Sequence, residues 1–411
     1  MSAALSVLAL LAIASGLGLI VAVWVRHHVA WYGTFPHSMR KTMVQLGLVR
    51  RIAGRPDEKP RLVRKGRKGD IWELSWKAPV GVTSEKVLAN RAAIEEALDC
   101  SLECWSERGL LHMRVGVAPI PDFHALEDGK ASTKGALVVH LGMGREGSLE
   151  ADLSDPPHTL IGGTSGRGKS TLLQSVIVQL AQRYDPSYVQ FLLVDLKGAV
   201  DMSTFDGLPH LYCPVVGRLE DAAAELQGLV EEQARRQDML RTLRCPNIGE
   251  YNRSVPQLEQ RLPYIVVVID EFAELLPKGW KGKEYDMRTA CWNAVSSLAR
   301  MGRASGIHAL LATQRPDADV VDPQTRANCG RVIATRCTTK FNSEVLLGPG
   351  NTAAWRLADR PGLAVYRVAR EVQVQLAYMP AADVEAAVQE LRLRYGMRPG
   401  LPAGGALEVT A

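Results

Sequence analysis

Residues 163–171 have the types and spacing needed to hold phosphate, because they fit the pattern G-x-x-x-x-G-K-[ST]. Glycines let a backbone curl until successive N–H groups point at phosphate oxygens, and a following helix adds partial positive charge. Lys169 would pair with the β- and γ-phosphates of ATP, and the Ser170 hydroxyl would coordinate Mg²⁺. A glycine-rich turn without a ligand is the alternative. The expected nucleotide-binding residues are Gly163, Thr164, Ser165, Gly166, Arg167, Gly168, Lys169, Ser170 and Thr171.

Two acidic residues, Asp270 and Glu271, directly follow the apolar run Ile-Val-Val-Val-Ile at 265–269. A run this apolar predicts a strand buried on both faces, and open α/β sheets bind their ligands at the carboxyl ends of such strands. Asp270 would hold Mg²⁺ through water, and Glu271 would orient and polarise an attacking water, which favours a hydrolase over a kinase. The alternative is a strand that ends in two solvated acids.

Three further polar side chains are candidates for the same chemistry. Gln314 follows the apolar run 308–312, and an amide at a strand end can bond the γ-phosphate or the attacking water. Arg300 and Arg303 lie at the end of an amphipathic helix, from which an arginine can reach the γ-phosphate of a neighbouring subunit. The alternative for Gln314 is that it simply caps the strand. The alternative for Arg300 and Arg303 is that they are solvated surface arginines.

The elements that must position these residues begin near residue 151. From there apolar runs alternate with helical segments, which is typical of a parallel sheet with right-handed crossovers. Residues 69–150 indicate a small α+β region that carries no residues for chemistry. Strands are predicted at 159–161, 189–194, 264–269, 308–312, 332–335 and 372–378, and helices at 171–182 and 381–394.

The segment 1–25 differs in character from the rest, since no residue from Ser2 to Val25 is charged. A helix of this length spans about 36 Å, enough for a hydrocarbon core of about 30 Å. A cleaved signal peptide would need a basic start and a shorter apolar core. The segment 26–68 then carries 12 Lys or Arg against 2 acids, which predicts that the chain beyond the anchor is cytoplasmic. We expect a single-pass anchor in the inner or plasma membrane.

The composition limits the class of protein. The chain has 411 residues, of which 46% are hydrophobic and 23% charged, so wholesale disorder, collagen and disulfide scaffolds are excluded. The net charge of +5 arises in the segment 26–68, which supplies +10, so the overall charge does not argue for a nucleic-acid partner. The seven cysteines are odd in number and scattered, as in a reduced compartment. Cys100, Cys104 and His112 lack the second ligand pair of a metal site.

Four blocks in order, at 157–163, 194–198, 269–275 and 302–316, resemble the FtsK/SpoIIIE family of DNA-pumping motor ATPases. The resemblance covers about residues 135–380. It implies a RecA-like P-loop motor domain with a mostly parallel sheet, assembled as a homo-hexameric ring around double-stranded DNA. The expected domains are a transmembrane anchor at 1–25, a basic juxtamembrane linker at 26–68, a small α+β domain at 69–150, the motor at 151–380, and a C-terminal helix and flexible tail at 381–411.

The sequence also departs from part of that family. Members dedicated to chromosome segregation have several membrane helices, a long linker and a C-terminal winged-helix domain, whereas only one predicted helix and a tail come after Tyr378 here. The chain is more similar to actinobacterial plasmid and integrative-element transfer proteins. We therefore expect an ATP-driven DNA translocase in conjugative or intercellular transfer. The alternatives are a chromosome-segregation or cell-division pump and a protein-secretion or coupling ATPase. Residues 195–197 and 201–209 are either elements of the DNA pore or ordinary loops.

Overall fold

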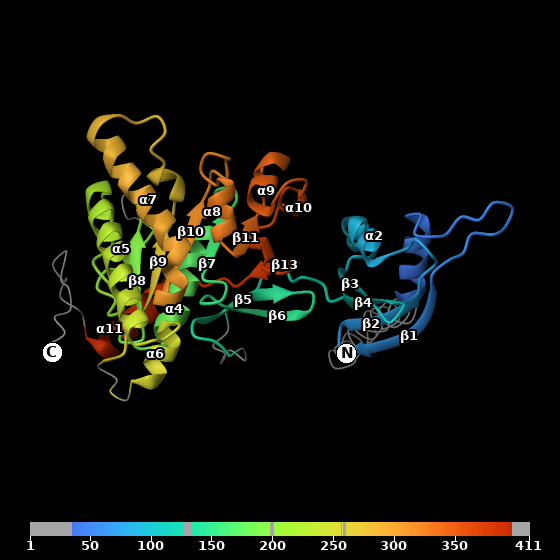
Figure 1. The fold of residues 1–411 in the computed structure, drawn as a ribbon, viewed down its shortest axis with the longest axis horizontal. Coiled ribbons are helices and arrows are strands. Elements are labelled where there is room, and N and C mark those ends of the chain that lie inside the picture. The colour runs from blue at the N-terminus through green and yellow to red at the C-terminus, as the bar shows by residue number, and fades with distance from the viewer. Residues whose placement is uncertain (1–34, 127–133, 198–200, 256, 258–259, 397–411) are drawn as a thin grey trace, which may run out of the picture. The chain divides into compact units, whose positions relative to one another are not determined.

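The computed structural model describes residues 35–126, 134–197, 201–255, 257 and 260–396, and it divides the chain into two compact units (Figure 1). Unit 1 ends at Pro119 and unit 2 begins at Ile120. The expected anchor at 1–25 and the tail after 396 lie outside the described residues. Among the described residues, no helix combines the length and apolarity needed to cross a membrane.

Unit 1 is an antiparallel four-stranded sheet with helices against it, in the strand order β1-β2-β4-β3. A helix over residues 35–45 buries Phe35, Met39 and Met43, which recur at every fourth position and therefore share one helix face. They pack with the buried Trp76 of the sheet. The elements are β1 (Arg61–Lys68), β2 (Ile71–Lys77), α2 (Ser84–Ala89), α3 (Arg91–Leu98), β3 (Ser101–Glu107) and β4 (Leu110–Gly116).

Two domain boundaries differ from the sequence-based expectation. The expected linker at 26–68 contributes the helix at 35–45 and strand β1 to unit 1, because the apolar residues of that helix recur at helical spacing while the basic residues from 40 to 68 stay in solvent. The expected small domain at 69–150 ends at Pro119 instead. The segment after 137 joins the large sheet, since β5 (Val138–Gly144) pairs with β13 (Glu371–Leu376) from the far end of the motor sequence.

Unit 2 is built on a nine-stranded mixed sheet in the order β6-β5-β13-β12-β11-β7-β10-β9-β8. The five strands from β11 to β8 run parallel, and the remaining neighbours pair antiparallel. The α/β class with a largely parallel motor sheet is therefore confirmed. The further strands are β6 (Gly147–Asp152), β7 (His158–Gly162), β8 (Val189–Val194), β9 (Tyr264–Ile269), β10 (Ile307–Thr313), β11 (Arg331–Thr335) and β12 (Leu363–Arg367).

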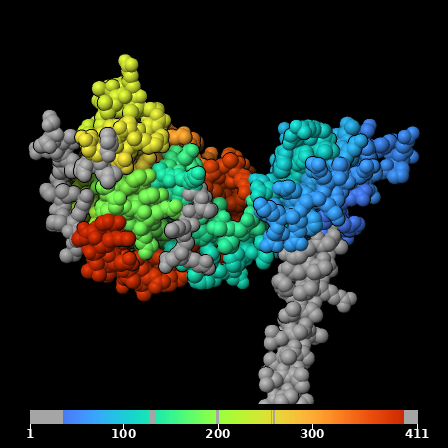
Figure 2. Space-filling model, turned by 90° about the horizontal axis from the view of Figure 1, so that it is seen from below, coloured from blue at the N-terminus to red at the C-terminus, as the bar shows by residue number. Residues whose placement is uncertain are grey.

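Helices cover both faces of this sheet, which explains why its central strands are apolar throughout. In β9, Val266 and Val268 belong to the core beneath α4 and α11, whereas Ile265, Val267 and Ile269 belong to the core beneath α5 and α7 (Figure 1). The helices are α4 (Lys169–Arg183), α5 (Leu219–Thr242), α6 (Ile248–Ser254), α7 (Gly282–Ser305), α8 (Pro323–Asn328), α9 (Lys340–Leu347), α10 (Ala353–Arg356) and α11 (Ala381–Tyr395), with short 3₁₀ turns η1 (Ser203–Phe205) and η3 (Phe272–Leu275). Because α11 packs beside α4, the red C-terminal surface adjoins the green surface of the central segment (Figure 2).

The parallel order brings four strand ends to one edge of the sheet. Strands β7, β10, β9 and β8 are consecutive neighbours, so their carboxyl ends lie side by side. The residues that follow these ends are Gly163, Gln314, Asp270 and Asp195. This edge is where an open α/β sheet binds its ligand.

Candidate nucleotide-binding site

The phosphate loop connects β7 to α4 and is held from behind by the end of β11. The backbone N–H of Thr164 donates to the carbonyl oxygen of Arg336 at 3.1 Å, and the Thr164 hydroxyl donates to the same oxygen at 3.1 Å. Gly163 has a φ of +139°, and a Cβ there would lie 2.0 Å from the Thr335 hydroxyl oxygen. Gly168 has a φ of +91° as α4 begins. Glycine is therefore required where the loop leaves the strand and where it enters the helix.

The remaining loop residues lie on its outer side. Ser165 and Gly166 are exposed, and Thr171 lies half-buried in the first turn of α4. Arg167 forms an ion pair with Asp359, and its carbonyl oxygen accepts a hydrogen bond from the N–H of Gly362 at 3.2 Å. The segments near the C-terminus therefore support the loop, which the sequence motifs did not predict.

Lys169 folds back over the phosphate loop. Its Nζ donates to the carbonyl oxygens of Gly163 at 2.7 Å and Thr164 at 2.6 Å, and the residue is 5% exposed. Burial lowers the pKa of Lys169 to about 8, against the opposing effect of the Glu271 and Asp270 carboxylates. A bound phosphate can replace the two carbonyls and restore the charged form of the side chain.

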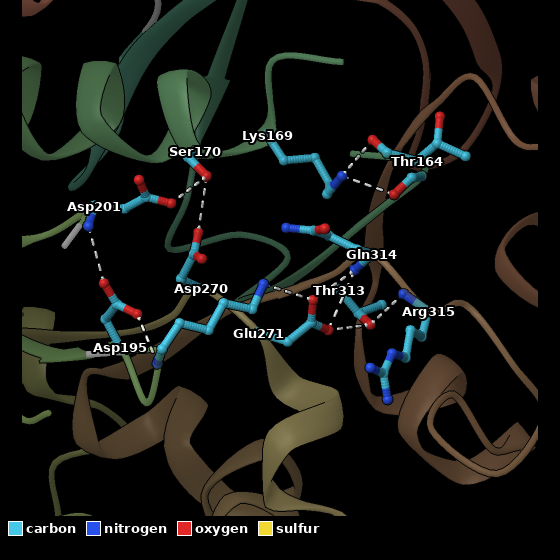
Figure 3. Close-up of polar contacts among 12 residues, drawn as sticks. Thr164, Lys169, Ser170, Asp195, Asp201, Asp270, Glu271, Thr313, Gln314 and Arg315 are labelled. Carbon is cyan, nitrogen blue, oxygen red and sulfur yellow. Dashed lines mark hydrogen bonds and ion pairs between the residues drawn. The ribbon is translucent and has the colours of Figure 1, made fainter. Parts of the chain in front are cut away.

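Ser170 and Asp270 lie next to each other as the sequence predicts. The Ser170 hydroxyl is 3.1 Å from Asp270 Oδ1 and 3.2 Å from Asp201 Oδ2 (Figure 3). Asp270 is 2% exposed, and its Oδ2 atom has no hydrogen-bond partner among the described residues. Burial raises the pKa of Asp270, and the nearby Asp201 carboxylate adds to the effect.

This donor set fits Mg²⁺. A buried carboxylate oxygen without a partner is costly, and a cation would both bind it and offset the crowding of like charges. The available donors are hydroxyl and carboxylate oxygens, which Mg²⁺ prefers. Ser170, Asp270 and Asp201 are the residues that would hold it or its water ligands.

Glu271 is fixed by four contacts to its carboxylate. Oε1 accepts from the Thr313 hydroxyl at 2.7 Å, and the backbone N–H of Gln314 lies 3.2 Å from Oε1 and 3.1 Å from Oε2. Lys197 Nζ donates to Oε2 at 3.1 Å. The side chain of Gln314 points toward Lys169 (Figure 3). The structure therefore brings Lys169, Glu271 and Gln314 together, and their catalytic roles stay predictions.

The two arginine candidates do not reach the site of their own chain. Helix α7 ends at Ser305, immediately before β10 begins at Ile307, so Arg300 and Arg303 lie toward the amino end of β10. The nucleotide site lies at the carboxyl end of the same strand. Arg303 is exposed and forms an ion pair with Asp155 at 3.0 Å. A role in a neighbouring subunit's site stays a prediction.

Sequence reasoning missed several residues of the site. Asp195 accepts from the backbone N–H of Lys197 at 3.1 Å through Oδ1, and from that of Asp201 at 3.1 Å through Oδ2. This segment was expected to be a pore element or an ordinary loop, yet it supplies Lys197 to Glu271 and Asp201 to Ser170. The available signal was the position of Asp195 directly after an apolar strand, as for Asp270.

A phosphate loop between a strand and a helix, with two acids at the end of the next strand but one in the same sheet, defines the P-loop class of ATPases. Within that class, residues 125–318 match the model of the FtsK/SpoIIIE family. Over this segment the chain is similar to the ATPases of the FtsK/SpoIIIE family, as its sequence motifs predicted.

Two curated relatives show how far the likeness extends. The DNA translocase FtsK of Rickettsia typhi is 34% identical over 230 residues, which cover 49% of this chain and 30% of the relative. The DNA translocase FtsK of Haemophilus influenzae is 32% identical over 265 residues, which cover 58% of this chain and 48% of the relative. The chain therefore spans less than half the length of either relative.

Several solved structures resemble the chain, among them the following two. The pCW3 conjugation coupling protein TcpA, in its monomer form with ATPγS, is 27% identical with a TM-score of 0.62, covering 87% of this chain and 99% of TcpA. The cytoplasmic domain of the Thermomonospora curvata type VII secretion ATPase EccC is 25% identical with a TM-score of 0.53, covering 65% of this chain and 32% of EccC.

Proposed function

We propose that this chain is a membrane-anchored, ATP-driven translocase of double-stranded DNA that works in conjugative or intercellular DNA transfer. The likeness to the conjugation coupling protein TcpA carries the proposal, because it covers 87% of this chain and 99% of that protein. Unit 2 makes up less than three quarters of the chain, so the likeness includes part of unit 1. A match to the motor alone would not distinguish DNA transfer from chromosome segregation or protein secretion.

The geometry supports a simple course for ATP hydrolysis. Lys169 exchanges the carbonyls of Gly163 and Thr164 for the β- and γ-phosphates. Ser170 and Asp270 would hold Mg²⁺, which would supply positive charge to the site. Glu271 takes the proton of the attacking water, and Gln314 bonds the γ-phosphate or that water.

The remaining parts of the proposal concern assembly and place in the cell. A homo-hexameric ring would enclose the DNA, and Arg300 or Arg303 would reach the γ-phosphate of a neighbouring subunit. The segment 1–25 would anchor the ring in the inner or plasma membrane, with both units in the cytoplasm. The concentration of positive charge at 26–68 supports that orientation.

The test is ATP hydrolysis by the purified full chain with and without duplex DNA. A fragment starting at residue 69 is unsuitable, because it lacks β1 and the helix at 35–45. We expect duplex DNA to stimulate hydrolysis and Lys169→Ala to abolish it. A confirmed hexamer whose hydrolysis does not respond to duplex DNA would count against the proposal.

Two alternatives keep specific support. Likeness to the secretion ATPase EccC favours a protein-secretion motor, for which a substrate peptide rather than duplex DNA would stimulate hydrolysis. Identity to FtsK translocases favours a chromosome-segregation or cell-division pump. Loss of plasmid or element transfer in a strain that lacks the gene, with normal chromosome partition, would separate transfer from segregation.

A further inference from the structure

The hydrogen-bond acceptor positions of the Glu271 carboxylate are occupied by donors from the protein, which leaves none for water. Its two oxygens offer about four acceptor directions. The Thr313 hydroxyl and the Gln314 N–H occupy Oε1, while Lys197 Nζ and the same Gln314 N–H occupy Oε2. The side chain is also only 4% exposed. A general base has to accept a proton from water at hydrogen-bond distance, so one of these donors must leave before Glu271 can act.

The donors to Glu271 differ in their freedom to leave. Thr313 is the fully buried last residue of β10, and the Gln314 donor is a backbone N–H fixed by the same strand end. Lys197 instead reaches Glu271 through a long, flexible side chain that is 37% exposed. A lysine ammonium can turn to another partner without any change in the sheet. Lys197 is therefore the donor that can release Glu271.

We propose that Lys197 is a positioning residue that still restrains Glu271 when ATP first binds, and that its release, a slow step after binding, frees Oε2 to accept the proton of the attacking water. The restraint keeps basal hydrolysis low. This inference concerns hydrolysis alone and does not depend on what the motor moves, so its test contains no DNA.

The contacts of Asp195 connect this restraint to the nucleotide-binding residues. One Asp195 oxygen holds the backbone N–H of Lys197, and the other holds that of Asp201. The Asp201 carboxylate in turn lies 3.2 Å from the Ser170 hydroxyl. When Ser170 turns to a new ligand, Asp201 loses this partner, and the change reaches Lys197 through a single carboxylate.

The test measures steady-state ATP hydrolysis by the full chain carrying Lys197→Met, which keeps an unbranched side chain one atom shorter and removes the charge. We expect kcat without DNA to rise about five-fold with KM unchanged, which corresponds to about 1 kcal/mol, the upper range for a partly exposed ion pair. Lys197→Arg keeps a cation beside Oε2 and should restore the low rate. This split between kcat and KM is not expected of a purely structural residue.

Two controls make the result specific. Lys278→Met removes another lysine that pairs with a carboxylate, Asp319, in an exposed ion pair that contains no residue of the nucleotide site, and it should leave kcat unchanged. Lys197→Met added to Glu271→Gln should change nothing, because the restrained carboxylate is gone. If Lys197→Met leaves kcat unchanged or lowers it, Lys197 does not restrain Glu271 and the proposal fails.

Discussion

Lys169 has to be positively charged to hold phosphate, yet the folded chain buries it until its pKa falls to about 8. A lysine with this pKa is about three quarters protonated at pH 7.5 and about one tenth protonated at pH 9. If only the charged form binds tightly, the affinity for nucleotide falls about eight-fold between these pH values, or about 1.2 kcal/mol. An ordinary exposed lysine, with a pKa near 10.4, would lose almost nothing over the same range.

The assay is calorimetric binding of ATPγS to the full chain at pH 7.5, 8.2 and 9.0. The buffers contain Mg²⁺ and have matched ionic strength, so the triphosphate stays fully ionised. Lys169→Arg is the matched control, because a guanidinium stays charged throughout and should give weaker binding that does not change with pH. Glu271→Gln removes a carboxylate that raises the pKa of Lys169. The affinity of this variant for ATPγS should therefore begin to fall at a lower pH than that of the unmodified chain.

Two results would refute this reasoning. A dissociation constant of the unmodified chain that stays constant from pH 7.5 to 9 would mean that the pKa of Lys169 is not lowered. An equal decline in Lys169→Arg would assign the pH dependence to another group.

Three other perturbations test the site and the core around it. Glu271→Gln should lower hydrolysis at least about 10²-fold while ATPγS still binds, as measured by phosphate release and calorimetry; normal turnover would remove Glu271 from the mechanism. Gly163→Ala drives a Cβ to 2.0 Å from Thr335 Oγ1 and should lower the urea midpoint by more than Gly166→Ala, where nothing lies within 4 Å; equal midpoints would contradict the close contact. Burial lowers the pKa of His308 to about 3, so between pH 6.5 and 5 only the unfolded chain takes up this proton. The free energy of unfolding should therefore fall by about 1.6 kcal/mol as the pH drops over this range. His308→Gln should lack this part of the loss, and an unchanged pH dependence in that variant would refute the prediction.

Local sequence patterns were sufficient for the central strands and for the residues that directly follow them. The predicted strands 189–194 and 264–269 agree with β8 and β9, because a strand buried on both faces shows as a continuous apolar run. Asp270 and the phosphate loop could be placed at one sheet edge for the same reason.

Contacts between distant segments were not visible in those patterns. The bond from Thr313 to Glu271 joins residues 42 positions apart, and Thr164 meets Arg336 across 172. Such pairs depend on which strands become neighbours, which a local pattern does not encode. Likewise, Arg300 and Arg303 lie close in sequence to β10 but at its amino end. The nucleotide site lies at the carboxyl end of that strand.

The position of β7 between β10 and β11 has a consequence for the time at which this enzyme becomes active during its synthesis. The ribosome completes Lys169 early, whereas β11 and the Arg336 carbonyl emerge only after β8, β9 and β10 have been made. Until then β7 has one open edge and Thr164 has no backbone partner behind the phosphate loop. A nascent chain that contains every residue of the family match, up to 318, therefore still lacks a supported site. We therefore expect the chain to become competent for ATP only once β11 has paired with β7.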